Sequence, residues 1–511
     1  MCAGMYIGFI NIQIVASSLQ QIQAGLGATA DQVSWVLTAA LIAEVIMIPL
    51  SGWLSRVVST RWLFTGCVGG FTVASFGCAN AWNIESMIVF RALQGFGGGA
   101  LMPMVFATVY TVIPRHRQTF VMTVVAIIST SSLAIGPALG GWLTEVLDWR
   151  WLFWVNLPIG LAIMATVAAL VRFDRPEPGL LRQVDFLGIA LAAVSLGCLL
   201  IVLEEGRRQD WFDSTMIVAL AIVSALAGYL FLWRELTARH PVVDLRVFKD
   251  LNFTIGTFYI AMFGALLYIP VYLLPLYLAR VRDIDTFQIG TIMAVLGLSM
   301  VLSGAITGIL LRYLSRRVIA LIGFSTMALG TWSQSFLTSE YGFAEFLLPQ
   351  VLRGLATQLC WLSMATLALG SLAPHQVRNG SALFNLVMRL GAAVSIAVAN
   401  AALYVRTRVH YAEIAETVQL EPPDVTSIMP QLRSMFESVT GDSPLAGQAG
   451  LSMIVDMAQR EALVLAFNDV TLAAAVVGLL SLVLLPLIRE RPHEEAGAGA
   501  ADQVPSQSGA R

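Results

Sequence analysis

The sequence predicts an all-α integral membrane protein that crosses the bilayer fourteen times. Three observations lead to this fold class: 57% of the 511 residues are hydrophobic, only 12% are charged, and the mean hydropathy is +0.76. Soluble domains carry about 25% charged residues, so this chain has too little polar surface to coat a water-facing globule. A soluble enzyme, a disordered scaffold and a secreted disulfide scaffold are therefore excluded.

The spans can be read as apolar runs that are each long enough to cross roughly 30 Å of hydrocarbon as a helix. The runs cover residues 1–19, 33–54, 62–80, 86–108, 120–143, 151–171, 184–203, 215–233, 252–278, 287–311, 318–337, 344–369, 380–404 and 464–488. Helices are expected throughout, because backbone polar groups in lipid must be satisfied within their own segment. The first run has few basic residues and no small-residue cleavage site, so it is interpreted as a span rather than a signal peptide.

The basic residues predict the orientation of the chain. Short loops on one side hold Arg56, Arg61, Arg115, Arg117, Arg172, Arg175, Arg182, Arg234, Arg239, Arg246, Lys249, Arg312, Arg316, Arg317 and Arg378, whereas those on the other side hold only Arg150, Arg207, Arg208, Arg280 and Arg282. Since Lys and Arg favour cytoplasmic loops, we expect a protein of the inner (cytoplasmic) membrane with both termini in the cytoplasm. The tail 489–511 is rich in small and polar residues and is predicted to be disordered.

One connection is much longer than the rest. Residues 405–463 are expected to form an extracytoplasmic loop in which Ala412–Val418 and Leu432–Val439 could each form about two amphipathic turns. A simple tether and a docking element for a partner both remain open, although loops of this length are usually functional.

The sequence gives no support for catalysis or for a bound cofactor. The five cysteines are widely spaced and the five histidines lie outside the apolar runs, so no metal site is predicted. The sole lysine, Lys249, has no P-loop around it, which excludes ATP-driven pumping by this chain. An intramembrane enzyme would need paired carboxylates or an activated nucleophile in the spans. We predict no catalytic residue, no cofactor and no nucleic-acid partner, with a proton gradient as the energy source.

Three motifs carry the functional signal. Residues 91–95 read R-x-x-Q-G, residues 136–141 read G-P-x-x-G-G, and residues 149–160 read W-R-W-x-F-x-x-N-x-P-I-G. An Arg inside an apolar helix is unfavourable unless it faces a cavity or a partner, and glycines let neighbouring helices approach closely. We therefore expect Gly136, Pro137, Gly140 and Gly141 to form a conformational motif.

These three motifs, occurring in this order, resemble those of the 14-helix drug:proton antiporters of the major facilitator superfamily, the EmrB/QacA type. Further matches are 185–188, 241–245 and 379–382, with Asn385 and Arg389. The resemblance implies a six-helix bundle at 1–172, an inserted helix pair at 182–235 and a second six-helix bundle at 250–488. It also implies multidrug efflux of amphipathic small molecules, with a periplasmic membrane-fusion adaptor and an outer-membrane channel as partners. A proton-coupled importer or exporter of a specific metabolite on the same fold is the alternative.

The sequence departs from the family pattern at two places. The first span of the family carries an Asp where this chain has Asn11. The loop after the second span should read like G-x-L-A-D-R-x-G-R-R, but residues 52–61 keep only Gly52, Leu54 and Arg61. The acidic residue of that loop is therefore missing.

Glu44 is the one carboxyl predicted near the middle of the membrane. It lies about eleven residues into the second run, roughly 16 Å from either end. Because an intramembrane ionisable group is functional by default, Glu44 is the candidate proton carrier, with hydrogen-bonded packing as the alternative. Arg91 is expected to hold Glu44 or Asn11 in one state and to release them in the other.

The remaining candidates are polar groups that could line a substrate cavity. They are Asn11, Gln13, Gln94, Arg353, Asn385 and Arg389. For Arg353 and Arg389, clamps between helices and cavity-lining groups are both open. Five aromatic side chains could face the cavity but are more often packing residues: Trp35, Tyr268, Tyr272, Trp361 and Phe384.

Overall fold

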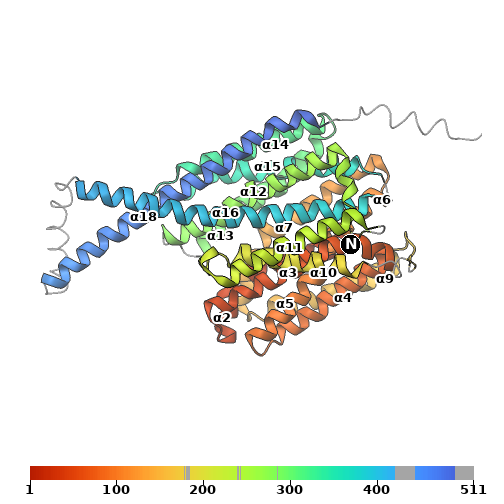
Figure 1. The fold of residues 1–511 in the computed structure, drawn as a ribbon, viewed down its shortest axis with the longest axis horizontal. Coiled ribbons are helices and arrows are strands. Elements are labelled where there is room, and N and C mark those ends of the chain that lie inside the picture. The colour runs from red at the N-terminus through yellow and green to blue at the C-terminus, as the bar shows by residue number, and fades with distance from the viewer. Residues whose placement is uncertain are drawn as a thin grey trace, which may run out of the picture.

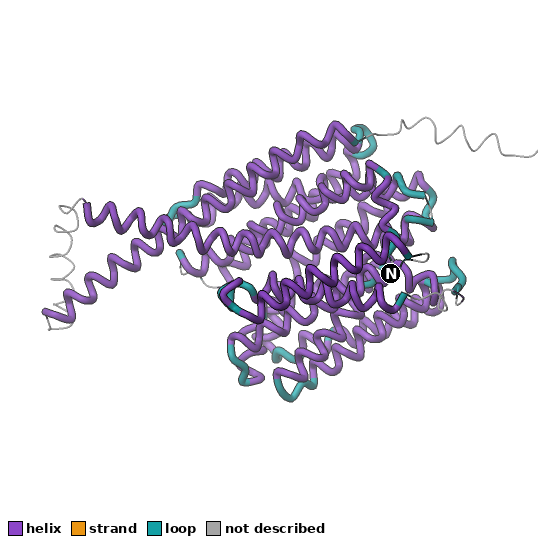
Figure 2. The backbone as a smooth tube through the Cα atoms, in the orientation of Figure 1, coloured by secondary structure: helices purple, strands orange, loops and turns teal. Residues whose placement is uncertain are grey.

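The computed structural model is built almost entirely of helices (Figures 1 and 2) and describes residues 1–177, 179, 185–238, 241, 243–282, 284, 286–373, 375–420 and 443–488. The longer helices are α1 (Cys2–Ser17), α2 (Leu19–Leu26), α3 (Ala30–Val58), α4 (Thr60–Ala79), α5 (Ile84–Gly99), α6 (Leu101–Val112), α7 (Arg115–Val146), α9 (Asn156–Leu170), α10 (Phe186–Glu205), α11 (Thr215–Thr237), α12 (Leu251–Arg280), α13 (Thr286–Leu310), α14 (Arg316–Ser333), α15 (Phe343–Gly370), α16 (Val377–Leu420) and α18 (Ser443–Ser481). Short helical turns are α8 (Trp151–Trp154), η2 (Trp211–Asp213), η3 (Leu245–Lys249), η4 (Gln334–Phe336) and η5 (Leu482–Leu487).

The prediction of an all-helical membrane protein is confirmed, but the count of fourteen spans is not. Among the described residues, eleven helices are long and apolar enough to cross a membrane, or twelve if α1 and α2, which meet at a bend of 67°, form one span. Helices also cover the predicted runs 318–337 and 344–369, as α14 and α15, but these two are not among the eleven. The physical reason is their polarity: α14 opens with two arginines, and α15 carries polar side chains that are buried against other helices.

The long helices pack in two groups with a helix pair beside them. In the first group α3 packs on α5, α5 on α4, α4 on α9 and α1 on α7. In the second, α12 packs on α16, α13 and α14 on α15, and α16 on α18. The groups meet where α7 contacts α13 and where α16 contacts α3 and α6. This arrangement places the middle of α3 opposite the first third of α16, where Glu44 meets Arg389.

The helix pair α10–α11 is attached to both groups. Its own helices pack together, and α10 also contacts α3 and α16. At the start of α10, the Asp185 carboxylate accepts a hydrogen bond from Arg234 Nε at 2.8 Å and one from the Gly188 amide at 3.0 Å. Burial alone would raise the pKa of Asp185, but these hydrogen bonds lower it below its usual value. The carboxylate therefore stays charged and fixes the start of the pair.

The predicted loop 405–463 is largely helical where the structure describes it. The helix α16 continues to Leu420 and α18 already begins at Ser443, and both project beyond the bundle (Figure 1). The predicted turn Ala412–Val418 lies in α16, whereas Leu432–Val439 and the tail 489–511 lie outside the described residues. At the base of the projection, Asp469 accepts hydrogen bonds from Arg406 Nε at 2.5 Å and pairs with His410 Nε2 at 2.7 Å. The two helices are thus tied together where they leave the bundle.

Candidate functional site

An ion pair joins the two helix groups at the centre of the bundle. Glu44 lies midway along α3, and its Oε1 atom is 2.7 Å from Nη2 of Arg389 in α16. Only 12% of the Glu44 side chain and 14% of the Arg389 side chain is exposed. The Arg389 guanidinium also lies over the ring of Phe9, 5.4 Å from its centroid. Protonating Glu44 would remove one charge of the pair and weaken the link between the groups.

Arg91 forms a second polar centre within the first group. Its Nη1 donates to Asn11 Oδ1 at 2.7 Å and to Gln94 Oε1 at 2.5 Å, and its Nε donates to the Val36 carbonyl at 3.0 Å. Gln94 in turn donates to the Ser75 hydroxyl at 2.6 Å. Arg91 therefore binds Asn11, one of the two partners expected for it. The other expected partner, Glu44, pairs with Arg389 instead.

The glycines that follow Arg91 set the distance between α3 and α5. A Cβ atom on Gly95 would collide with the carbonyl oxygen of Ala40, and one on Gly99 would collide with that of Glu44. Residues four apart share one helix face, so both glycines contact α3 with backbone alone. A larger residue at either position would push α3 away and displace Glu44 from Arg389.

Of two neighbouring cavities, the first lies within the first helix group and has only Arg389 from the second group in its lining, whereas the second lies between the two groups. The first has an empty volume of about 430 Å³ and is lined by the polar residues Asn11, Glu44, Arg91, Gln94 and Arg389 together with apolar side chains. The second, of about 510 Å³, is mainly apolar, and its lining includes Phe263, Tyr268, Met300, Gln358, Trp361 and Met388. Phe9 and Met102 line both cavities. The arrangement puts a cavity with charged and polar lining next to one with a mainly apolar lining.

Two of the five candidate aromatic side chains line the second cavity. These are Tyr268 and Trp361, which come from α12 and α15. Phe384 is fully buried in the core, whereas Tyr272 is 36% exposed. Trp35 lines neither of the two cavities described above.

Arg353 is the counterpart of Arg91 in the second group. It is fully buried, and its Nη1 donates to Gln334 Oε1 at 2.8 Å and to Gln350 Oε1 at 3.0 Å, while Nη2 donates to the Leu267 carbonyl at 3.4 Å. It lines neither cavity, so its contacts are those of a clamp between helices. Arg389, the other residue with two open roles, lines the first cavity.

The remaining predicted residues line neither cavity. Asn385 is buried and donates to the Ser381 carbonyl at 2.8 Å, a hydrogen bond within α16. Gln13 contacts α7 at Gly136, where a Cβ atom would come within 2.5 Å of the Gln13 Cβ. A Cβ atom on Gly140 would lie 2.7 Å from the carbonyl oxygen of Ile14. The glycines of the motif thus bring α7 against α1.

The other two residues of the motif differ from these glycines. Gly141 faces open space, and Pro137 lies inside α7 without ending the helix.

Comparison with known proteins places the chain in a family. Residues 1–396, more than three quarters of the sequence, match the Major Facilitator Superfamily. The chain belongs to this superfamily. As a member of this transporter family it is not an enzyme, which confirms the prediction from sequence.

The relatives of this superfamily member include proteins named as exporters. It is 34% identical over 479 residues to the colistin resistance protein EmrB of Acinetobacter baumannii, covering 93% of each chain. It is 27% identical over 498 residues to the multidrug export protein EmrB of Escherichia coli K12, covering 97% of this chain and 94% of that one. It is 26% identical over 499 residues to the fatty acid resistance protein FarB of Neisseria gonorrhoeae, covering 97% and 96%. The resemblance to EmrB-type proteins is therefore confirmed.

Solved structures of the superfamily share the fold. The human organic anion transporter MFSD10 superposes with a TM-score of 0.57 at 13% identity, covering 95% of this chain and 97% of that one. The proton:xylose symporter XylE gives a TM-score of 0.56 at 13% identity, covering 96% and 94%. At this level of identity the likeness concerns the fold alone.

Sequence reasoning did not pair Glu44 with Arg389. Glu44 lies midway along its predicted span, and Arg389 lies about nine residues into its own span. Their opposite charges at interior positions of two spans could have predicted that they form a pair. The apolar lining from Phe263, Met300 and Met388 gave no signal, because methionine and phenylalanine are common throughout the spans.

Proposed function

We propose that this superfamily member exports amphipathic or hydrophobic small molecules, among them toxic compounds and antibiotics, in exchange for protons. The observation that carries the proposal is the Glu44–Arg389 pair, a titratable link between the two helix groups that lines a central cavity. In the charged state the pair holds α3 against α16. Protonation of Glu44 removes the attraction and lets the groups move relative to each other, as alternating access requires.

The neighbouring cavity supports the substrate class. Its aromatic and methionine side chains offer an adaptable apolar surface, while Thr357 and Gln358 provide a few polar contacts. Because Phe9 and Met102 line both cavities, the two cavities are neighbours. An amphipathic molecule in the apolar cavity could therefore place its polar part near the Glu44–Arg389 pair. The relatives are named for colistin resistance, multidrug export and fatty acid resistance, which fits amphipathic cargo.

The proposed location is the inner, cytoplasmic membrane, with both termini in the cytoplasm. The bias of Arg residues supports this orientation. The loops after α3, α6, α9 and α13 and the start of α16 share one end of the bundle, which we call the basic end. In the proposed orientation the basic end faces the cytoplasm and the projecting ends of α16 and α18 face outwards.

The direction of transport can be tested in everted membrane vesicles that contain the protein. With an imposed gradient, acidic inside, we expect uptake of amphipathic dyes and fatty acids into the vesicles and a matching release of protons. Collapse of the gradient with an uncoupler should stop both. Proton flow in the same direction as the substrate would instead favour the importer, and transport that ignores the gradient would contradict proton coupling.

A further part of the proposal is that the chain works with a periplasmic membrane-fusion adaptor and an outer-membrane channel. Its support is the projection of α16 and α18, whose outer parts extend past the bundle and expose Leu451, Met453 and Met457. Since such side chains have no bundle to cover, they suit contact with another protein.

Replacing residues 415–455 with a short Gly/Ser linker should leave the fold and substrate binding in detergent unchanged, because Arg406, His410 and Asp469 at the base of the projection are kept. The same change should abolish cross-linking to a co-expressed adaptor and resistance in intact cells. A second variant, Met457→Ser, changes one exposed residue of the projection outside the replaced segment and should weaken cross-linking without removing it. Full resistance and full adaptor capture by the shortened protein would show that the projection is only a tether.

A further inference from the structure

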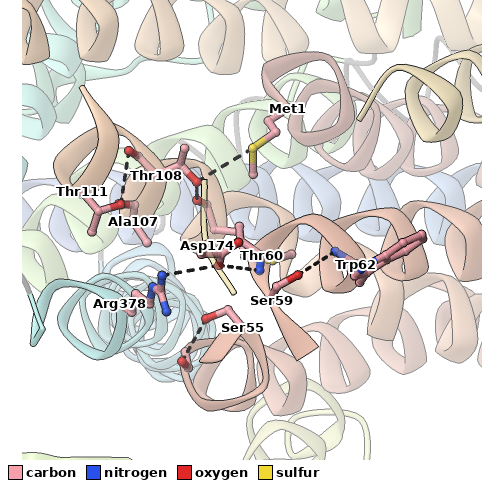
Figure 3. Close-up of polar contacts among 12 residues, drawn as sticks. Met1, Ser55, Ser59, Thr60, Trp62, Ala107, Thr108, Thr111, Asp174 and Arg378 are labelled. Atoms are coloured by element: carbon pink, nitrogen blue, oxygen red, sulfur yellow. Dashed lines mark hydrogen bonds and ion pairs between the residues drawn. The ribbon is translucent and has the colours of Figure 1, made fainter. Parts of the chain in front are cut away.

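The two helix groups are joined at the basic end by a carboxylate from the segment that follows α9. Asp174 Oδ2 accepts a hydrogen bond from the backbone amide of Thr60 at 2.7 Å and another from the Thr60 hydroxyl at 2.6 Å. The same oxygen lies 3.4 Å from Nη2 of Arg378 in the first turn of α16. Figure 3 shows Asp174 between Thr60 and Arg378. One buried oxygen therefore contacts both helix groups.

The Asp174 carboxylate lies at the N-terminus of helix α4. The first amides of a helix have no partner within the helix and carry partial positive charge, and Thr60 is the first residue of α4. The Asp174 side chain is only 8% exposed, compared with 23% for Arg378. Charge-assisted hydrogen bonds in such an enclosed place are stronger than those at a surface.

This is also the place where the sequence lacks an acidic residue. The resemblance pattern for 52–61 requires an Asp at the position of Arg56. In the structure the segment after α9 runs alongside this loop, because the Glu177 amide donates to the Arg56 carbonyl at 3.0 Å. The loop thus receives a carboxylate from 114 residues further along the chain.

Other contacts show that the two groups meet at this end. The Ser381 hydroxyl donates to the Pro103 carbonyl at 3.2 Å, and the Tyr110 hydroxyl donates to the Ala365 carbonyl at 3.3 Å. A Cβ atom on Gly52 would lie 3.1 Å from the Arg378 carbonyl oxygen. Among these contacts, the Asp174–Arg378 pair is the one between opposite charges.

We propose that Asp174 takes the place of the missing loop acid and, by binding the start of α4 and Arg378 together, holds the basic end of the transporter closed. It acts as a positioning residue, since it touches neither cavity. When the groups separate at this end, the Arg378 contact breaks while the hydrogen bonds to Thr60 can stay. The proposal goes beyond the proposed function, because it requires neither a particular substrate nor proton coupling.

The test measures the distance between the two groups at the basic end directly. Spin labels are attached at Val112 and Tyr313, which are exposed residues of different groups, after Cys2 and Cys198 are replaced by Ser. In Asp174→Asn we expect the population with the long distance to rise by about five- to tenfold, the effect of losing one charged contact. Asp174→Glu keeps the charge and should keep most of the closed population. Asp213→Asn, the same change at an exposed residue of the opposite end, should have no effect.

A double-mutant cycle decides whether Asp174 acts through Arg378. Arg378→Gln should open the basic end to a similar extent, and the double variant should open it no further than the stronger single variant. Additive effects, or an unchanged distance distribution in Asp174→Asn with only a lower melting temperature, would show that Asp174 merely caps α4 and would overturn the proposal. If the distance between the labels shifts in Asp174→Asn but the unmodified protein does not transport substrate in vesicles, the proposed role of Asp174 still holds. Only the proposed export function is then contradicted.

Discussion

Replacing Glu44 by Gln should abolish proton-driven export while leaving a folded protein. The amide cannot release or take up a proton, and it replaces the charged bond to Arg389 with a neutral one. We expect uptake into everted vesicles to fall at least about tenfold, with a loss of stability of no more than about 5 kcal/mol, the upper end for breaking a buried ion pair. Substrate binding in detergent should remain, because the apolar cavity is lined by other residues.

Two further variants make this result specific. Glu85→Gln makes the same chemical change at an exposed residue in the first turn of α5 and should transport normally. Asn11→Asp added to Glu44→Gln restores a carboxylate 2.7 Å from Arg91 Nη1 and should recover part of the coupling. Normal gradient-driven transport by Glu44→Gln would exclude Glu44 as the proton carrier.

Arg91→Ala should eliminate transport, whereas Arg91→Lys should keep part of it. The Ala variant leaves the side-chain oxygens of Asn11 and Gln94 buried without their donor, at about 1–3 kcal/mol for each group. Lys restores the charge but not the planar fork that reaches several acceptors at once. Transport in proteoliposomes and thermal unfolding, measured on the same samples, separate loss of coupling from loss of fold.

Arg353 provides the matched control for this prediction. It is equally buried and is also held by glutamine oxygens, but it lines neither cavity. Arg353→Ala should therefore lower stability as much as Arg91→Ala, with a smaller loss of transport per folded molecule. Equal activity of Arg91→Lys and Arg91→Ala would instead assign Arg91 a packing role.

The course of the helices was predictable because apolarity marks a segment that faces lipid. The same signal is weaker where a helix faces protein, as in α15, or continues beyond its apolar run, as α16 does after residue 404. There the polar stretch 405–420 looks like a loop in the sequence although it continues a helix. Hydropathy indicates whether a residue is surrounded by lipid, protein or water. Because these surroundings can change along one continuous helix, hydropathy does not show where the helix ends.

The site was predictable in its parts but not in its pairing. Glu44 was identified because a carboxyl midway along a span has few explanations other than function. Its partner Arg389 lies 345 residues away, and their meeting depends on how α3 and α16 are aligned across the bundle. The role of Asp174 could not be predicted for the same reason. In the sequence it is an ordinary loop carboxylate, and only the fold brings it next to Thr60.

The helix pair α10–α11 restricts how a molecule dissolved in the bilayer could reach the cavities. Because α10 packs against both α3 and α16, it covers the seam between the two groups on that side, with Gly197 close to Ile42 and Ile46. Acyl chains of the surrounding lipid therefore have no sideways entry there. The other seam, between α7 and α13, has no added helix pair among the described elements, and sideways passage from the lipid would have to take that route.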